Sequence, residues 1–165
     1  KILAEAGPSI EKFMAQGLTQ LSDKLGPINW QFMATKKFDP DDFGAFLTLL
    51  PKVMDGLRLR HAIEVRHPSF ATAAFTALAR KHGVAIVYAK DENFPEIDEA
   101  TADFTYARFM SSHEDIEAGV TDKELSGYLR QTKAWGKRGD VFAYFIAGAK
   151  VRNPAAAQAL IAKLK

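Results

Sequence analysis

The segment HAIEVRHPSF, residues 61–70, places two opposite charges inside an apolar, β-branched run that ends at a proline. The run is too short for a helix and predicts a buried strand. Side chains two residues apart on a strand share a face, so Glu64 and Arg66 are expected to point the same way. Buried charges are costly unless they are paired or hydrogen-bonded. The segment therefore predicts either a structural ion pair or one wall of a functional site at the C-terminal end of a strand.

Strands and helices are expected to alternate along the chain on both sides of this segment. Apolar strand candidates recur at residues 28–33, 62–66, 84–89, 104–110 and 141–147. Helical patterns are expected at about 8–25, 39–53 and 68–82, from 121 onward, and from 153 to the end. Strands that are apolar on both faces and alternate with helices predict a parallel sheet covered by helices. The acidic segment 91–102 predicts a long connection or the replacement of a helix.

Two α/β architectures fit this alternation: an open doubly wound sheet and a closed barrel. No strand is followed by a glycine-rich phosphate loop, which weakens the nucleotide-fold interpretation. Charged or polar residues at the ends of several strands fit a TIM-like (β/α) barrel, whose site gathers from many strand tips. We therefore predict a single domain over residues 1–165 with TIM-like barrel architecture.

The composition is typical of a globular domain. The chain has 165 residues, of which 47% are hydrophobic, enough for a sizeable core. Its 22 basic and 20 acidic residues give no electrostatic reason to expect nucleic acid or an anionic membrane as a partner. The absence of cysteine excludes disulfides and thiolate metal sites. We expect a cytoplasmic protein with no membrane span and no cofactor.

A series of short motifs runs in a fixed order along nearly the whole chain. They are LGP at 25–27, WQF at 30–32, FDP at 38–40, RHAIEVRHPSF at 60–70, HGVA at 82–85, TADFTYAR at 101–108 and VFAYF at 141–145. In order and spacing they resemble the YecE-like family, also called domain of unknown function 72. The resemblance implies a TIM-like barrel with no established activity.

The resemblance also carries an expectation about completeness. An eight-stranded barrel needs three more strand–helix units, so it implies that this chain covers about the last five. A missing N-terminal segment or another chain is then expected to complete the sheet. The chain also departs from the family pattern: Ile146-Ala147 stands where many members have two asparagines. The resemblance therefore implies a divergent branch.

Polar and charged side chains near the predicted strand ends form the candidate site. They are Gln31, Glu64, Arg66, Lys90 and Arg108. If they converge at the barrel mouth, two or three cations beside one carboxylate favour a small anionic or polar ligand such as a phosphate, a carboxylate or a sugar acid. Glu64 is then the candidate catalytic acid or base, and the other four bind ligand. The alternative is that Arg108 pairs with Glu64 or Asp91 and binds nothing.

The spacing His61-x-x-Glu64-x-x-His67 also invites a metal interpretation. On a strand, His61 and His67 share one face while Glu64 lies on the other, so no metal site is predicted. His67 is instead expected to end the strand and to help cap the helix that begins at Pro68.

Three functional hypotheses remain open from the sequence. The first is a barrel enzyme that acts on a small anionic or polyhydroxylated substrate. The second is a non-catalytic binding domain that uses the same pocket. The third is a structural or interaction domain with a decayed pocket, which the absence of the family's asparagines favours.

Overall fold

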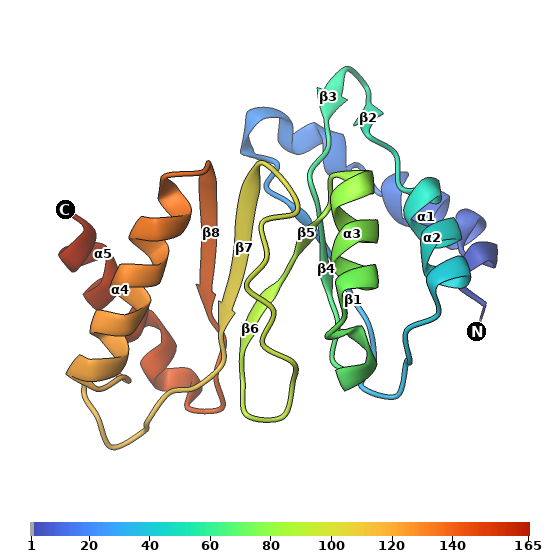
Figure 1. The fold of residues 1–165 in the computed structure, drawn as a ribbon. Coiled ribbons are helices and arrows are strands. Elements are labelled where there is room, and N and C mark those ends of the chain that lie inside the picture. Colours follow the sequence, from blue (N-terminus) through green and yellow to red (C-terminus); the bar gives the residue numbers. More distant parts are fainter. Residues whose placement is uncertain (1) are drawn as a thin grey trace.

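Parallel strands form the framework of the molecule, and the computed structural model describes residues 2–165 of it (Figure 1). One three-stranded sheet has the order β1 (Ile28–Gln31), β4 (His61–Glu64), β5 (Ala85–Ile86). A second has the order β6 (Tyr88–Lys90), β7 (Phe104–Phe109), β8 (Asp140–Phe145). Every neighbouring pair in both sheets is parallel. Only Val87 separates β5 from β6, so the two sheets continue one another, and the predicted parallel strands are confirmed.

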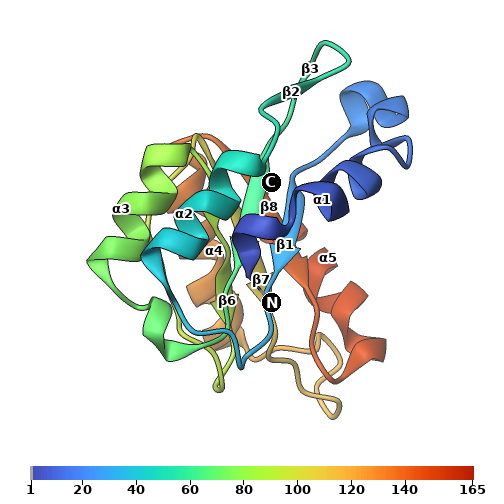
Figure 2. The ribbon, with the colours of Figure 1, turned by 90° about the vertical axis from the view of Figure 1, so that its right-hand side faces the viewer.

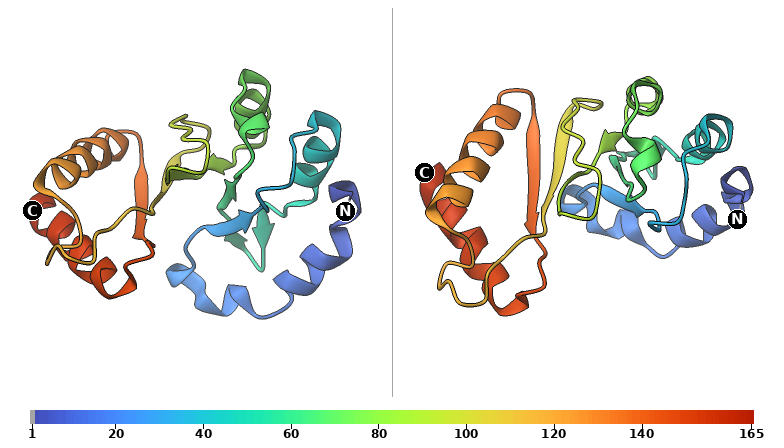
Figure 3. Two further views of the ribbon diagram at one scale, coloured as in Figure 1. Left: turned by 90° about the horizontal axis from the view of Figure 1, so that it is seen from below. Right: turned by 60° about the horizontal axis from the view of Figure 1, so that its bottom comes forward.

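Helices cover the outer face of this curved layer (Figure 3). The α-helices are α1 (Gly7–Met14), α2 (Pro40–Leu49), α3 (Ala73–His82), α4 (Asp122–Gly136) and α5 (Asn153–Leu164). Short 3-10 helices are η1 (Leu3–Glu5), η2 (Leu18–Lys24), η3 (Pro68–Phe70) and η4 (Lys150–Arg152). The Asp39 carboxylate caps α2, and Thr121 and Glu124 form the expected capping box of α4. No helix in the described part of the chain is long and apolar enough to cross a membrane.

The alternation of side chains divides the core between the two faces of the strands. On the outer face, aromatic and aliphatic side chains pack against α2 and α3 in one cluster and against α4 and α5 in another. The inner face carries a smaller apolar group that lies toward the N-terminal ends of the strands: Ala62, Ala85, Val87, Phe104 and Tyr106. The helices packed on the outer face therefore fix the strand backbone that carries the polar residues at the C-terminal ends of the strands.

The long N-terminal helix expected at about 8–25 is interrupted. Helix α1 ends at Met14, and Gly17 adopts a left-handed conformation with φ of 86° before η2 begins. Glycine takes up positive φ without the steric cost that other residues meet. The single-helix prediction is therefore wrong, because Gly17 ends the regular helix.

The helix expected at 39–53 is also shorter than predicted, and a hairpin follows it. Strands β2 (Val53–Met54) and β3 (Leu57–Arg58) pair antiparallel and project beyond the sheet (Figure 2). Asp55 and Gly56 at the turn have φ of 49° and 78°. An Asp-Gly pair with both φ values positive is typical of a tight hairpin turn. The apolar Val53 thus belongs to a strand, not to the helical pattern.

The connection between β6 and β7 contains no helix, as the acidic segment had suggested. Side chains fasten it to the rest of the domain. Trp135 Nε1 donates to Asp98 Oδ1 at 2.8 Å, and Thr101 Oγ1 donates to the Val84 carbonyl at 2.7 Å. This crossover therefore has a defined shape although it has no regular structure.

The sheet remains open within residues 2–165, where β1 and β8 are its two edge strands. The architecture is a mixed α/β fold with an open parallel sheet and helices on its outer face. The described residues form no closed barrel, and the TIM-like architecture of which they would be the last five units stays a prediction.

Candidate functional site

Glu64 is the centre of a charged cluster on the inner face, at the C-terminal end of β4. Its side chain is 0% exposed. Oε1 accepts hydrogen bonds from Nε and Nη2 of Arg66, at 3.1 and 2.8 Å. Oε2 accepts one from Asn29 Nδ2 at 3.0 Å and another from Arg108 Nη1. A buried carboxylate requires such partners, and here three side chains from three segments supply them.

Strand register explains why these residues meet. Glu64 lies beside Gln31 in the pairing of β4 with β1, so both side chains share the inner face. Arg108 on β7 also reaches this face, and its Nη1 donates to Gln31 Oε1 at 3.1 Å. Arg66 lies with its guanidinium 4.6 Å from the centre of the Phe94 ring. The structure thus brings together Gln31, Glu64, Arg66 and Arg108, as the sequence predicted.

Two buried polar atoms, one in the cluster and one on a neighbouring residue, have no hydrogen-bond partner among residues 2–165. They are Nε of Arg108 and Oδ1 of Asn29. A buried donor or acceptor without a partner costs free energy, so such groups mark either strain or a place where another molecule binds.

The cluster also determines the ionisation of Glu64. Burial by itself raises the pKa of this carboxyl, but hydrogen bonds from Asn29, Arg66 and Arg108 outweigh it and leave the pKa below its ordinary value. Glu64 is therefore ionised at neutral pH. Its charge is matched by two guanidinium groups, which leaves one positive charge in excess.

Lys90 does not join the cluster. Ala89 pairs with Arg108 and Lys90 with Phe109 in the β6–β7 register, so Lys90 points to the outer face. Its ammonium group lies 2.6 Å from Glu96 Oε2. The expected convergence of five residues is thus limited to four, because consecutive residues of a strand alternate between faces.

Three neighbours of the cluster were not selected from the sequence. Asn29 shares a face with Gln31 by the two-residue period, and this signal was available. Phe94 lies in the irregular crossover, where no periodicity points to it. Tyr144 on β8 packs against Tyr106 with ring centres 5.0 Å apart, and only the pairing of β7 with β8 brings them together.

The two histidines of the 61–70 segment have structural partners. Trp30 Nε1 donates to His61 Nδ1 at 3.0 Å, so the ring carries its proton on Nε2 and donates it to the Pro51 carbonyl at 2.7 Å. Burial lowers the pKa of His61 and keeps it neutral. His67 Nδ1 accepts from the Ser69 backbone at 3.1 Å and caps η3, as expected. No group of three or more ligating side chains suited to a metal occurs within residues 2–165.

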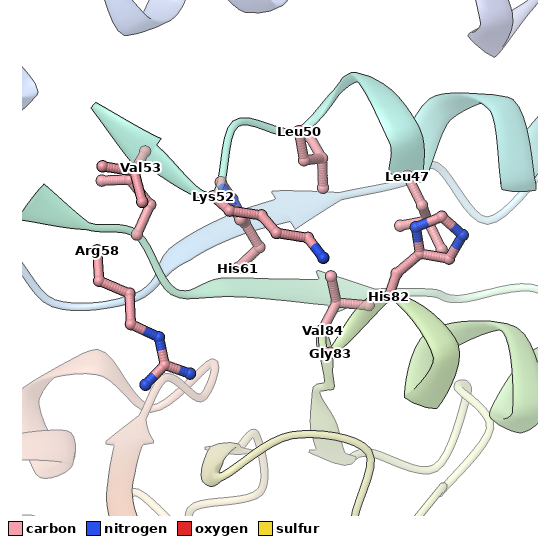
Figure 4. A pocket seen from close by; sticks show the side chains of 10 residues that line it. Leu47, Leu50, Lys52, Val53, Arg58, His61, His82, Gly83 and Val84 are labelled. Atoms are coloured by element: carbon pink, nitrogen blue, oxygen red, sulfur yellow. The ribbon is translucent and has the colours of Figure 1, made fainter.

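A pocket of about 280 Å³ lies at the opposite end of the strands, between the hairpin and the C-terminal ends of α2 and α3 (Figure 4). Leu47, Leu50 and Val84 give it an apolar floor, and Lys52 and His82 are basic residues on its wall. Burial lowers the pKa of His82, with smaller contributions from Lys81 and Lys52, so this ring adds no positive charge at neutral pH. Arg58, which also lines the pocket, pairs with Asp103, and the Glu64 cluster therefore remains the candidate site.

Comparison with known proteins agrees with this fold. A DUF72 family protein from Thermotoga maritima superimposes with a TM-score of 0.75 at 20% sequence identity, covering 96% of this chain and 64% of that chain. A DUF72 family protein from Enterococcus faecalis gives a TM-score of 0.75 at 14% identity, covering 94% of this chain and 67% of that chain. The chain thus spans about two thirds of the length of these neighbours. No curated protein matches it. The family model described as "Protein of unknown function DUF72" matches residues 1–165, and the chain belongs to that family.

Proposed function

We propose that the Glu64 cluster, formed by Gln31, Glu64, Arg66 and Arg108, binds a small anionic or polyhydroxylated ligand. The observation that carries the proposal is the excess of cationic donors over acceptors. Two guanidinium groups converge on one carboxylate, and the buried Nε of Arg108 has no partner among the described residues. Guanidinium groups bind carboxylates and phosphates through paired hydrogen bonds, so a phosphate, a carboxylate or a sugar acid suits the unused donors.

The surroundings of the site in the whole protein form the second part of the proposal. We place the cluster at the mouth of a TIM-like barrel that further sequence or another chain completes. Unpaired strand edges are a liability in a sheet, and β1 and β8 both present one. Met33, after β1, and Tyr144 and Ile146, at the end of β8, are exposed hydrophobic residues at these edges. Additional strands would cover them and enclose the inner face.

Glu64 acts in this proposal as an anchor that holds both arginines in place. A carboxylate that is kept ionised by three donors is a weak base and a poor proton donor at neutral pH. Ligand binding is therefore favoured over the catalytic role predicted for Glu64.

The competing function is a structural or interaction domain in which the cluster only stabilises the sheet. One observation favours it: both arginines already pair with Glu64. The two functions differ in what happens when a ligand is added.

Thermal melts of the full-length protein with and without phosphate, glucuronate or glucose separate them. A bound ligand raises the melting temperature in a concentration-dependent way. We expect phosphate or glucuronate to do so in the wild type and in the surface control Arg58→Met, but much less in Arg66→Met. Equal shifts in all three proteins, or no shift with any of these compounds, would contradict ligand binding at the cluster.

A further inference from the structure

A second pocket occupies the place beside α4 where the β6–β7 crossover lacks a helix. It has a volume of about 670 Å³, within the range of about 300–1,000 Å³ that is usual for small-molecule sites. It lies on the outer side of the sheet, near the C-terminal ends of β6 and β7 and the first turns of α4. It is therefore separate from the Glu64 cluster, which is on the inner face.

Hydrogen bonds hold the walls of this pocket in place. The Tyr88 hydroxyl, on β6, donates to Glu96 Oε1 at 2.8 Å and accepts from Gln131 Nε2 of α4 at 3.0 Å. The same Glu96 pairs with Lys90 through its other oxygen. On the opposite wall, His113 contacts Glu124 at 3.0 Å, and this pairing raises the pKa of His113. The crossover is thus fastened to α4 across the pocket.

Tyr128 gives the pocket a polar group in a fixed position. Its side chain is 5% exposed, and its ring is stacked on Phe109 with centres 4.1 Å apart, so its position is fixed. It lines the pocket together with Tyr88 and Gln131. Burial, with smaller effects of Glu124 and Glu96, raises its pKa to about 12. Tyr128 therefore keeps its proton and presents both a donor and an acceptor to the pocket.

The charges of the lining define what the pocket accepts. Four carboxylates line it, from Asp91, Glu92, Glu96 and Glu124, against the ammonium groups of Lys90 and Lys123 and the His113 ring, whose pKa is raised. The excess negative charge disfavours anions, and the many hydroxyl, amide and carboxylate groups suit a ligand rich in hydroxyl groups. We propose that this pocket binds a small neutral or cationic polyol. An amino sugar fits best, because it carries both hydroxyl groups and a positive charge. The pocket's charge preference is opposite to that of the Glu64 cluster.

Titration calorimetry of the full-length protein with glucosamine, glucose and glucose 6-phosphate tests the proposal. In Arg66→Met, which disables the anion site of the Glu64 cluster, we expect glucosamine to bind most tightly, glucose more weakly and glucose 6-phosphate most weakly. Tyr128→Phe removes one oxygen and should weaken glucosamine binding about threefold to tenfold, which corresponds to one lost hydrogen bond. The matched control Tyr144→Phe, on the inner face, should bind like the wild type.

A further variant separates this site from the Glu64 cluster. Arg66→Met should leave glucosamine binding unchanged, because it acts on the other face of the sheet. In the Arg66→Met background, binding of glucose 6-phosphate as tight as that of glucosamine would overturn the proposal. So would wild-type affinity in Tyr128→Phe, or no heat of binding with glucosamine at millimolar concentrations.

Discussion

Replacing Arg108 with methionine removes one of the two guanidiniums that hold Glu64. The Arg108 side chain is only 11% exposed and Glu64 is 0% exposed, so this ion pair is shielded from water. Breaking a buried pair by removing one partner costs about 3–5 kcal/mol, because the remaining charge is left without compensation. Arg66 keeps both of its hydrogen bonds to Oε1, and Asn29 keeps one to Oε2. We therefore expect a loss near the lower limit, about 3 kcal/mol of unfolding free energy.

Urea unfolding followed by circular dichroism measures this loss. A loss of about 3 kcal/mol corresponds to a melting temperature lower by about 6–12 °C for a domain of this size. The control is Arg58→Met, because Arg58 is 74% exposed and its pair with Asp103 lies at the surface. Exposed pairs contribute less than about 1 kcal/mol. If the free energies of unfolding of Arg108→Met and the control differ by less than about 1 kcal/mol, Arg108 contributes no more than an exposed pair does, and the reasoning is refuted.

A second substitution checks the cause of the loss. If the penalty of Arg108→Met comes from the buried charge, adding Glu64→Gln should recover part of the lost stability, because the amide carries no charge to compensate. If charge is not the cause, the stability losses of the two single variants should simply add in the double variant. Such additivity would show that packing, not charge, decides the effect.

Two further predictions concern other parts of the fold. NMR titration of the ring signals should show His113 titrating above pH 6.5 and His61 below it, since the carboxylate of Glu124 raises the first pKa and burial lowers the second. Below pH 6.5, His61 therefore binds a proton more readily in the unfolded chain than in the folded protein, so the free energy of unfolding falls as the pH drops. The reverse order of titration of the two histidines would contradict the burial argument. Gly139→Ala should cost about 3 kcal/mol, because φ is 153° and an added Cβ would collide with the Asp103 carbonyl. Gly127→Ala, within α4 and with open space at its Cβ, should instead gain up to about 1 kcal/mol in the same urea assay, and a similar loss in both variants would refute the steric reasoning.

Local patterns in the sequence predicted the parallel strands and the core of the site. The two-residue period was enough to place Glu64 and Arg66 on one face, because the charges interrupt an otherwise apolar run. The same period could not show which face of β6 is the inner one, because that strand is apolar on both faces. Only the pairing of Ala89 with Arg108 decides this, and it turns Lys90 away from the cluster.

The errors in the helices have local causes. The apolar spacing continues past Leu50, but Asp55-Gly56 turns the chain into a hairpin, a signal that was present in the sequence. Gly17 likewise ended a helix that periodicity extended to about residue 25. No pattern within residues 2–165 specifies whether the sheet closes, since β1 and β8 are its edge strands among these residues.

The central claim is that Arg66 and Arg108 together bind a small anion on the inner face. A crystal structure of the full-length protein soaked with glucuronate tests it most directly, because it locates the ligand. The account predicts density for the carboxylate within hydrogen-bonding distance of both guanidiniums, with Glu64 still paired to them. Density only at other positions, or an unchanged cluster with no ligand beside it, would contradict the claim.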